Sequence, residues 1–112
     1  MKTLTPEAAA AAAASVPRWT MADNALRRTL TFPGFPDAIA FVNAVAVAAE
    51  SAGHHPDIEV RWNRVTLTLT THDAGGLTSR DFALAAALDA LRPDALRPDA
   101  AEAQVSQPAA TI

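Results

Sequence analysis

The sequence contains no cysteine among its 112 residues, so disulfides and thiolate metal ligands are excluded. It also contains no cluster of lysine and arginine. Its 9 basic and 12 acidic residues are interspersed and give a formal net charge of -3. Because a phosphate backbone is bound by concentrated positive charge, we expect no nucleic-acid partner. Histidine and carboxylate side chains are left to carry the polar chemistry.

Long apolar runs are absent as well. Glu50 and His54 end the longest one, short of the roughly 20 apolar residues that cross a bilayer, so we expect no membrane segment. The start, "MKTLTPEAAAAAAASVPRW", has the lysine and apolar run of a signal peptide. However, Pro6 and Glu7 stand where a leucine-rich core would begin. We therefore expect a cytoplasmic protein.

The length predicts one domain, over residues 16–92, with two flanking segments. Residues 1–15 form an alanine-rich segment in which Thr5, Pro6 and Glu7 predict a helix start, with a hydroxyl cap, an early proline and an acid near the positive end. This helix lacks large apolar side chains and should bury little area. After the last helix, the repeat "LRPDALRPDA" and an aperiodic stretch predict that residues 93–112 are disordered.

Two kinds of periodicity organise the central domain. Alternating apolar residues predict strands over residues 25–32, 57–62 and 65–71, and a further strand could lie within 18–24. Helical spacing predicts helices over residues 36–52 and from 78 to about 92. This order favours an α+β fold, in which helices cover one face of an antiparallel sheet.

Local signals set the element ends. Gly53 fits the left-handed C-cap of the central helix. Thr78 and Asp81 resemble a capping box at the start of the last helix. Asn63 and Arg64 are predicted to form a two-residue hairpin turn. Arg28 interrupts the apolar side of its strand.

The segment "HHPD" raises the question of chemistry. Glu50 lies one helical turn before His54, so its carboxylate can approach that imidazole, and His72 lies nine residues before Asp81. If the hairpin folds back over the helix end, three imidazoles and two carboxylates can converge. They would then form a metal site, an acid/base site or a set of structural side chains.

Residue spacing separates these three interpretations only in part. His54 and His55 are adjacent and lack the helical spacing of HExxH, which disfavours a metal site. Imidazole titrates near pH 6.5, at about physiological pH, so one histidine can donate a proton while another accepts one. Ser51 and Ser79 lack the turn that activates a nucleophilic serine. Acid/base chemistry without a metal or cofactor therefore remains, beside the structural interpretation.

The two tryptophans differ in what their positions predict. Trp62 alternates with Ile58 and Val60 and is expected in the core. Trp19 follows a proline and an arginine, and it is equally consistent with the core and with a pocket wall.

Taken together, these residues resemble a family signature. The spacing is Glu50, three residues, His54-His55-Pro56, five residues, Trp62, nine residues, His72, eight residues and Asp81. This spacing resembles the signature of the pterin-4a-carbinolamine dehydratase family. The resemblance covers about residues 16–92 and includes the upstream Trp19. Five spaced elements in register make a more specific match than the histidine pair alone.

The resemblance implies an α+β domain with a four-stranded antiparallel sheet, helices packed on one face and a fourth strand near residues 19–21. It implies dehydration of a 4a-hydroxytetrahydropterin to a quinonoid dihydropterin, with no metal and no cofactor. The implied catalytic residues are His54, His55 and His72, of which His54 or His72 protonates the departing hydroxyl and His55 chiefly orients the pterin. The residues implied to bind or orient substrate or histidines are Glu50, Thr70, Thr71, Asp81 and Trp19.

The resemblance also implies partners. Family members form homodimers through sheet edges, and often homotetramers, and they support an aromatic amino acid hydroxylase by recycling its pterin. Two non-catalytic roles occur on the same scaffold, namely helping a transcription factor to dimerise and assisting enzyme assembly. The complete set of three histidines in this sequence favours the catalytic role.

Overall fold

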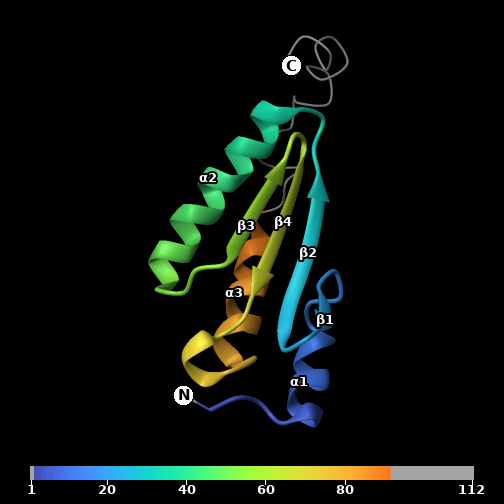
Figure 1. Ribbon diagram of the computed structural model, residues 1–112, viewed down its shortest axis with the longest axis vertical. Coiled ribbons are helices and arrows are strands. Elements are labelled where there is room, and N and C mark those ends of the chain that lie inside the picture. The colour runs from blue at the N-terminus through green and yellow to red at the C-terminus, as the bar shows by residue number, and fades with distance from the viewer. Residues whose placement is uncertain (1, 92–112) are drawn as a thin grey trace.

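A computed structural model describes residues 2–91, and the predicted disordered tail lies outside the described residues (Figure 1). The sheet is built from four strands, β1 (Thr20–Ala22), β2 (Ala25–Thr31), β3 (Asp57–Arg61) and β4 (Arg64–Leu69). The helices are α1 (Pro6–Ala13), α2 (Phe35–Ala52), α3 (Ser79–Ala90) and a short 3-10 turn, η1 (His72–Ala74).

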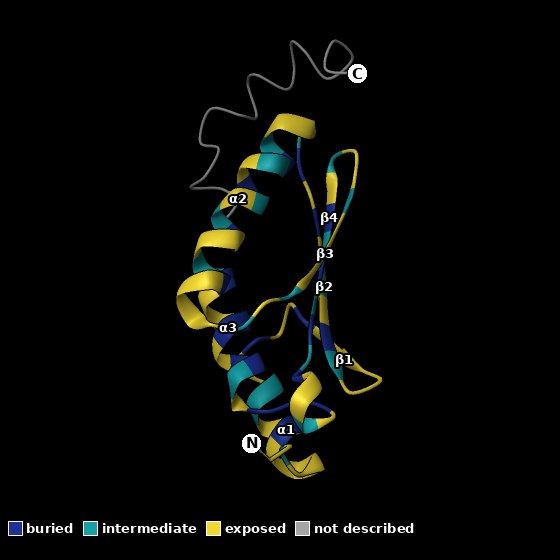
Figure 2. Ribbon diagram, turned by 60° about the vertical axis from the view of Figure 1, so that its left-hand side comes forward, coloured by how far each residue is buried: buried dark blue, intermediate teal, exposed yellow. Residues whose placement is uncertain are grey.

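The strands form one antiparallel sheet in the order β1-β2-β4-β3. Helices α2 and α3 lie on one face of this sheet, and no helix of residues 2–91 covers the opposite face (Figure 2). The predicted α+β fold is therefore confirmed, including the fourth strand, which occupies residues 20–22. The predicted alanine helix is also present, although it ends at Ala13 rather than near Ser15.

The core lies between the sheet and the two helices α2 and α3. Alternate residues of the two central strands are buried beneath the helices, namely Leu26, Leu30, Val65, Leu67 and Leu69. The buried stripe of α2 repeats every three or four residues and consists of Ala38, Phe41, Val45 and Ala49. The rings of Phe32 and Phe41 meet with centroids 5.2 Å apart. The strand and helix periodicities thus point their apolar residues into one layer.

Arg28 is explained by a contact across this layer. Its guanidinium forms an ion pair with Asp89 of α3, and the same carboxylate oxygen accepts a hydrogen bond from Nε1 of Trp19 at 2.9 Å. The arginine therefore interrupts the apolar side of β2 because it links the sheet to α3. Trp19 is 5% exposed and belongs to the core.

The hairpin departs from the sequence prediction. Arg61 pairs with Arg64, so the turn consists of Trp62 and Asn63 rather than of Asn63 and Arg64. Trp62 has a φ of 54° and is 48% exposed, and the prediction that it lies in the core is wrong. Because the backbone at Trp62 is left-handed, its side chain does not continue the alternation of side chains along β3. The turn is held by the Asn63 side-chain amide, which donates to the Phe32 carbonyl at 2.8 Å.

Helix α2 meets the length and composition of a membrane span, with 18 residues and a mean hydropathy of 1.2. Its buried stripe packs against the sheet, and a helix that covers a sheet is apolar for this reason. The hydropathy of α2 is therefore weak evidence for a membrane segment.

The packing predicts where the fold is sensitive. Leu67 is fully buried in the central strand β4, so Leu67→Ala should lower the free energy of unfolding by about 2–5 kcal/mol through lost burial and a cavity. Val47 is 72% exposed on α2, and Val47→Ala should change it by less than about 0.5 kcal/mol. Urea titration followed by circular dichroism measures both. Equal losses in the two variants would contradict this account of the core.

Candidate active site

The turn after α2 positions the two adjacent histidines. Gly53 has a φ of 64°, and its N–H donates to carbonyls of the last helical turn, as the sequence predicted for a left-handed C-cap. The Gly53 carbonyl in turn accepts a hydrogen bond of 2.6 Å from the Arg80 guanidinium of α3. This contact ties the turn that carries His54 and His55 to the start of α3.

His54 faces α3 and meets a buried carboxylate. Its Nε2 lies 2.6 Å from Oδ1 of Asp81, and the two side chains are 10% and 0% exposed. The second oxygen, Oδ2, accepts hydrogen bonds from the Thr71 hydroxyl at 2.8 Å and from the Thr78 backbone N–H at 2.9 Å. Asp81 therefore orients His54 and also completes the predicted capping box of α3.

His55 makes a separate pair on the other side of the chain. Its Nε2 lies 2.9 Å from Oε1 of Glu50, and the two side chains are 62% and 82% exposed. We expected Glu50 to approach His54, and this expectation is wrong. The left-handed residue Gly53 turns the chain so that His54 points to α3, while the next side chain faces back toward the last turn of α2.

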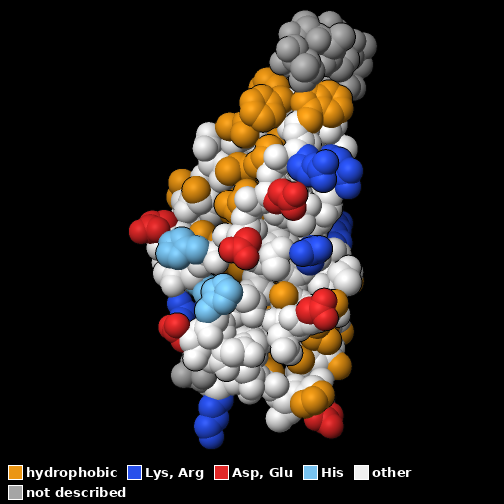
Figure 3. All heavy atoms as spheres, viewed as in Figure 1, with side chains coloured by type: hydrophobic (Ala, Val, Ile, Leu, Met, Phe, Trp, Pro, Cys, Tyr) orange, Lys and Arg blue, Asp and Glu red, His pale blue; other side chains and the backbone are white. Residues whose placement is uncertain are grey.

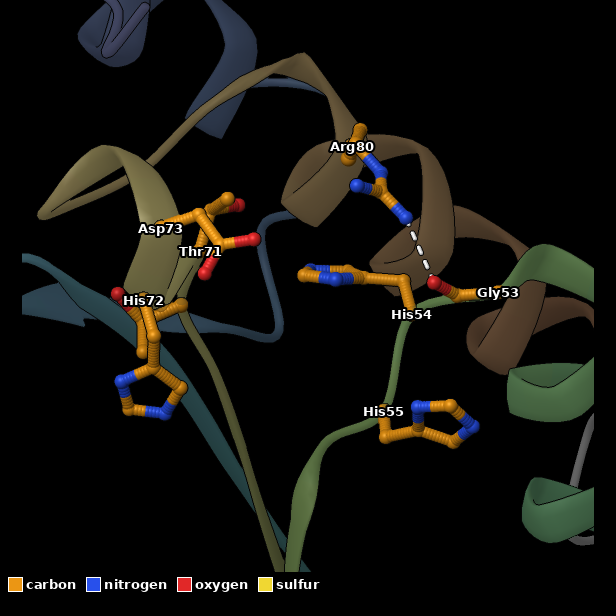
Figure 4. Close-up of a pocket in the computed structure, with 8 residues that line it drawn as sticks. Gly53, His54, His55, Thr71, His72, Asp73 and Arg80 are labelled. Atoms are coloured by element: carbon orange, nitrogen blue, oxygen red, sulfur yellow. Dashed lines mark hydrogen bonds between the residues drawn. The ribbon is translucent and has the colours of Figure 1, made fainter. Parts of the chain in front are cut away.

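The three histidines border one open cavity of about 260 Å³ between the end of α2, the end of β4 and the start of α3. Figure 4 shows that the His54 ring projects into the space between η1 and α3, whereas the His55 and His72 rings turn outward in different directions. His72 is exposed. Within residues 2–91, no three histidine or carboxylate side chains lie close enough to hold a metal ion.

The remaining predicted site residues have different surroundings. Thr70 lines the cavity, and its hydroxyl donates to the Asn24 carbonyl at 2.8 Å. Thr71 also lines it but is only 5% exposed, with its hydroxyl bonded to Asp81. Trp19 is not brought to this cavity, because its side chain packs in the core and its indole N–H bonds to Asp89.

Sequence reasoning missed two charged residues that line the cavity. Asp73 follows His72 in η1, and Arg80 precedes Asp81 in the first turn of α3. Each is adjacent in sequence to a predicted site residue, and this adjacency is the signal that could have identified it. The surface view shows carboxylates and histidines close together on this side of the molecule (Figure 3).

Fold and site together define a small α+β domain with a carboxylate-oriented imidazole in an open polar cavity, an arrangement suited to proton transfer. The chain belongs to the pterin 4 alpha carbinolamine dehydratase family, whose sequence profile matches residues 2–91. The resemblance read from the histidine spacing is therefore confirmed.

Individual relatives agree with this assignment. A protein of Acidobacterium capsulatum, provisionally named a pterin-4-alpha-carbinolamine dehydratase, is 54% identical over 91 residues, which cover 81% of this chain and 99% of the relative. One from Chloroflexus aurantiacus (strain ATCC 29366 / DSM 635 / J-10-fl), with the same provisional name, is 63% identical over 73 residues, or 65% of this chain and 78% of the relative.

Two solved structures share the fold. A Brucella melitensis protein described as a transcriptional coactivator/pterin dehydratase has a TM-score of 0.76 and 32% identity, covering 80% of this chain and 98% of that one. A pterin dehydratase-like protein identified as a RuBisCO assembly factor in the alpha-carboxysome has a TM-score of 0.54 and 29% identity, and the match covers 66% of this chain and 86% of that one. The family scaffold is thus described with more than one role.

The two histidine–carboxylate pairs should differ in their contribution to stability. Asp81 is fully buried with three hydrogen bonds, so Asp81→Asn should lower the free energy of unfolding by about 1–3 kcal/mol, because an amide cannot accept all three. Glu50→Gln alters a solvent-exposed pair and should leave stability nearly unchanged. Urea unfolding at neutral pH measures both, and an equal effect would show that the burial of Asp81 is unimportant.

Proposed function

We propose that this protein catalyses the dehydration of a 4a-hydroxytetrahydropterin to the quinonoid dihydropterin by histidine acid/base catalysis. The observation that carries the proposal is the His54 imidazole, which projects into the cavity while buried Asp81 holds its other side. An oriented imidazole is a common general acid or base, and its position is set before substrate arrives. Family membership supports the same chemistry.

The reaction is a loss of water without oxidation or reduction. A general acid protonates the 4a-hydroxyl, the carbon–oxygen bond breaks, and water departs. A base removes a ring N–H proton, and its bonding electrons form the new carbon–nitrogen double bond. His54 and His72 come from different elements that border the cavity, and we assign this pair of proton transfers to them.

The other polar groups suit binding and orientation. His55 and Glu50 form an exposed pair, which we assign to holding the pterin. Thr70 offers hydroxyl lone pairs at the cavity wall, since its proton is donated to Asn24. An open cavity of about 260 Å³ suits a flat bicyclic ring better than a larger ligand, because typical small-molecule sites are about 300–1,000 Å³.

The wider setting is part of the same proposal. We propose a cytoplasmic protein that recycles tetrahydropterin for an aromatic amino acid hydroxylase. We also propose that it forms a homodimer or a homotetramer. Within the described residues, β1 and β3 are the edges of the sheet, and strand pairing between copies would cover such an edge.

A second candidate is a non-catalytic binding or assembly module. The RuBisCO assembly factor and the transcriptional coactivator among the structural neighbours favour it, as do the exposed apolar side chains of Phe35 and Trp62. Such a module has no need for an oriented imidazole. The complete histidine set and the buried His54–Asp81 pair favour the dehydratase.

Stopped-flow absorbance of 4a-hydroxytetrahydropterin dehydration tests the proposal directly. Wild type should accelerate the reaction in the presence of a chelator, and His54→Ala and His72→Ala should each lose about 10²- to 10⁴-fold in kcat, the usual range for a general acid or base. No acceleration by wild type would favour the binding or assembly role.

His55→Ala provides the internal comparison. Because His55 is paired with Glu50 at the exposed side of the cavity, its loss should chiefly raise KM for the pterin. A fall in kcat as large as that of His54→Ala would contradict the division of roles between the adjacent histidines.

A further inference from the structure

The proton positions around Asp81 can be deduced from its partners. Oδ2 accepts from the Thr71 hydroxyl and from the Thr78 backbone N–H, which leaves Oδ1 for His54 at 2.6 Å. An ionised carboxylate has no proton to donate, so its partners must supply the protons. Asp81 is 0% exposed, and all three of these donors are groups of the protein itself.

Two threonine hydroxyls form a directed chain behind this carboxylate. A hydroxyl carries one proton, and that of Thr71 is donated to Asp81. Thr71 and Thr78 hydroxyl oxygens lie 2.9 Å apart, so Thr78 must be the donor in this contact. The Thr78 oxygen in turn accepts from the Arg80 backbone N–H at 3.2 Å. Protons therefore point from Thr78 to Thr71 to Asp81.

This chain of hydrogen bonds determines which tautomer the neutral His54 ring adopts. With Asp81 accepting on both oxygens, Nε2 of His54 must carry a hydrogen in order to donate to Oδ1. A neutral imidazole has a single N–H, so Nδ1 then holds the free lone pair. Nδ1 is the ring nitrogen that Asp81 does not contact, on a ring that borders the cavity.

We infer that Thr71 is a positioning residue rather than a substrate contact, and that His54 exchanges protons with the substrate through Nδ1. The substrate part of this inference rests on the proposed dehydratase function, whereas the proton arrangement does not. The family resemblance implied that Thr71 binds or orients substrate or histidines. Its 5% exposure and its commitment to Asp81 argue instead for a role transmitted through the carboxylate.

Nitrogen NMR of the histidine side chains tests the proton arrangement in the intact protein without any ligand. Long-range nitrogen–hydrogen spectra of neutral His54, assigned with His54→Ala, should show a protonated Nε2 and an unprotonated, pyridine-like Nδ1. The opposite tautomer, with the proton on Nδ1, would overturn the inference. This readout is independent of whether the protein turns over pterins.

Substitution of Thr71 tests its positioning role. Thr71→Val removes the hydroxyl with little change in shape, so kcat should fall by about 10- to 100-fold as His54 loses its alignment, with KM within about twofold of wild type. The His54 Nε2–H signal should shift. Thr71→Ser retains the hydroxyl and should keep both readouts at their wild-type values. If the valine variant does not fold, a raised KM with unchanged kcat in Thr71→Ser, or a proton on Nδ1 of His54 in wild type, would overturn the inference.

Thr66→Val is the matched control. Its hydroxyl bonds to Thr29 between neighbouring strands, and it does not line the cavity, so kcat, KM and the His54 spectrum should stay unchanged. A raised KM with unchanged kcat in Thr71→Val would show that Thr71 contacts substrate and would overturn the inference. Wild type that shows the expected tautomer but no pterin turnover would reject the proposed function and leave the proton arrangement in place.

Discussion

The buried carboxylate of Asp81 joins three segments of the chain whose contacting residues lie 3, 10 and 27 positions from it in sequence. It caps the start of α3 through the Thr78 N–H, holds the segment between β4 and η1 through the Thr71 hydroxyl and fixes the turn after α2 through His54. A buried charge is costly unless its hydrogen bonds are complete, so these three contacts constrain one another. The same interaction therefore supports the fold and prepares the site.

The left-handed turn at Gly53 explains how two adjacent histidines come to have different environments. The turn directs His54 into the layer between α2 and α3, where it is 10% exposed, and leaves His55 at the surface beside Glu50. Arg80 holds the same turn through the Gly53 carbonyl. One imidazole is thereby oriented by a buried carboxylate, while its neighbour is exposed to solvent. The division of roles that we propose for them is based on this difference.

Much of the fold could be predicted because its signals are local. Apolar alternation identified the central strands, helical spacing identified α2 and α3, and Gly53 and Thr78 marked the helix ends. The errors fall on the hairpin and Trp62, which is exposed at the turn beside the edge strand β3. Alternation shows which side chains share a face of a strand. Alternation does not show whether the chain turns before the last alternating residue, as it does at Trp62. It also does not show whether another element covers that face of the strand.

The sequence by itself determined the family and the set of candidate residues, because the signature spacing of Glu50, the histidines and Asp81 is contained in the order of the chain. Only the tertiary structure decided how these residues pair. His54 and Asp81 are 27 positions apart, and their contact depends on how α3 docks beside the turn after α2. The same docking buries Thr71 behind Asp81 and places Trp19 in the core rather than at the cavity. No local pattern encodes these contacts, because each arises where separate elements pack together.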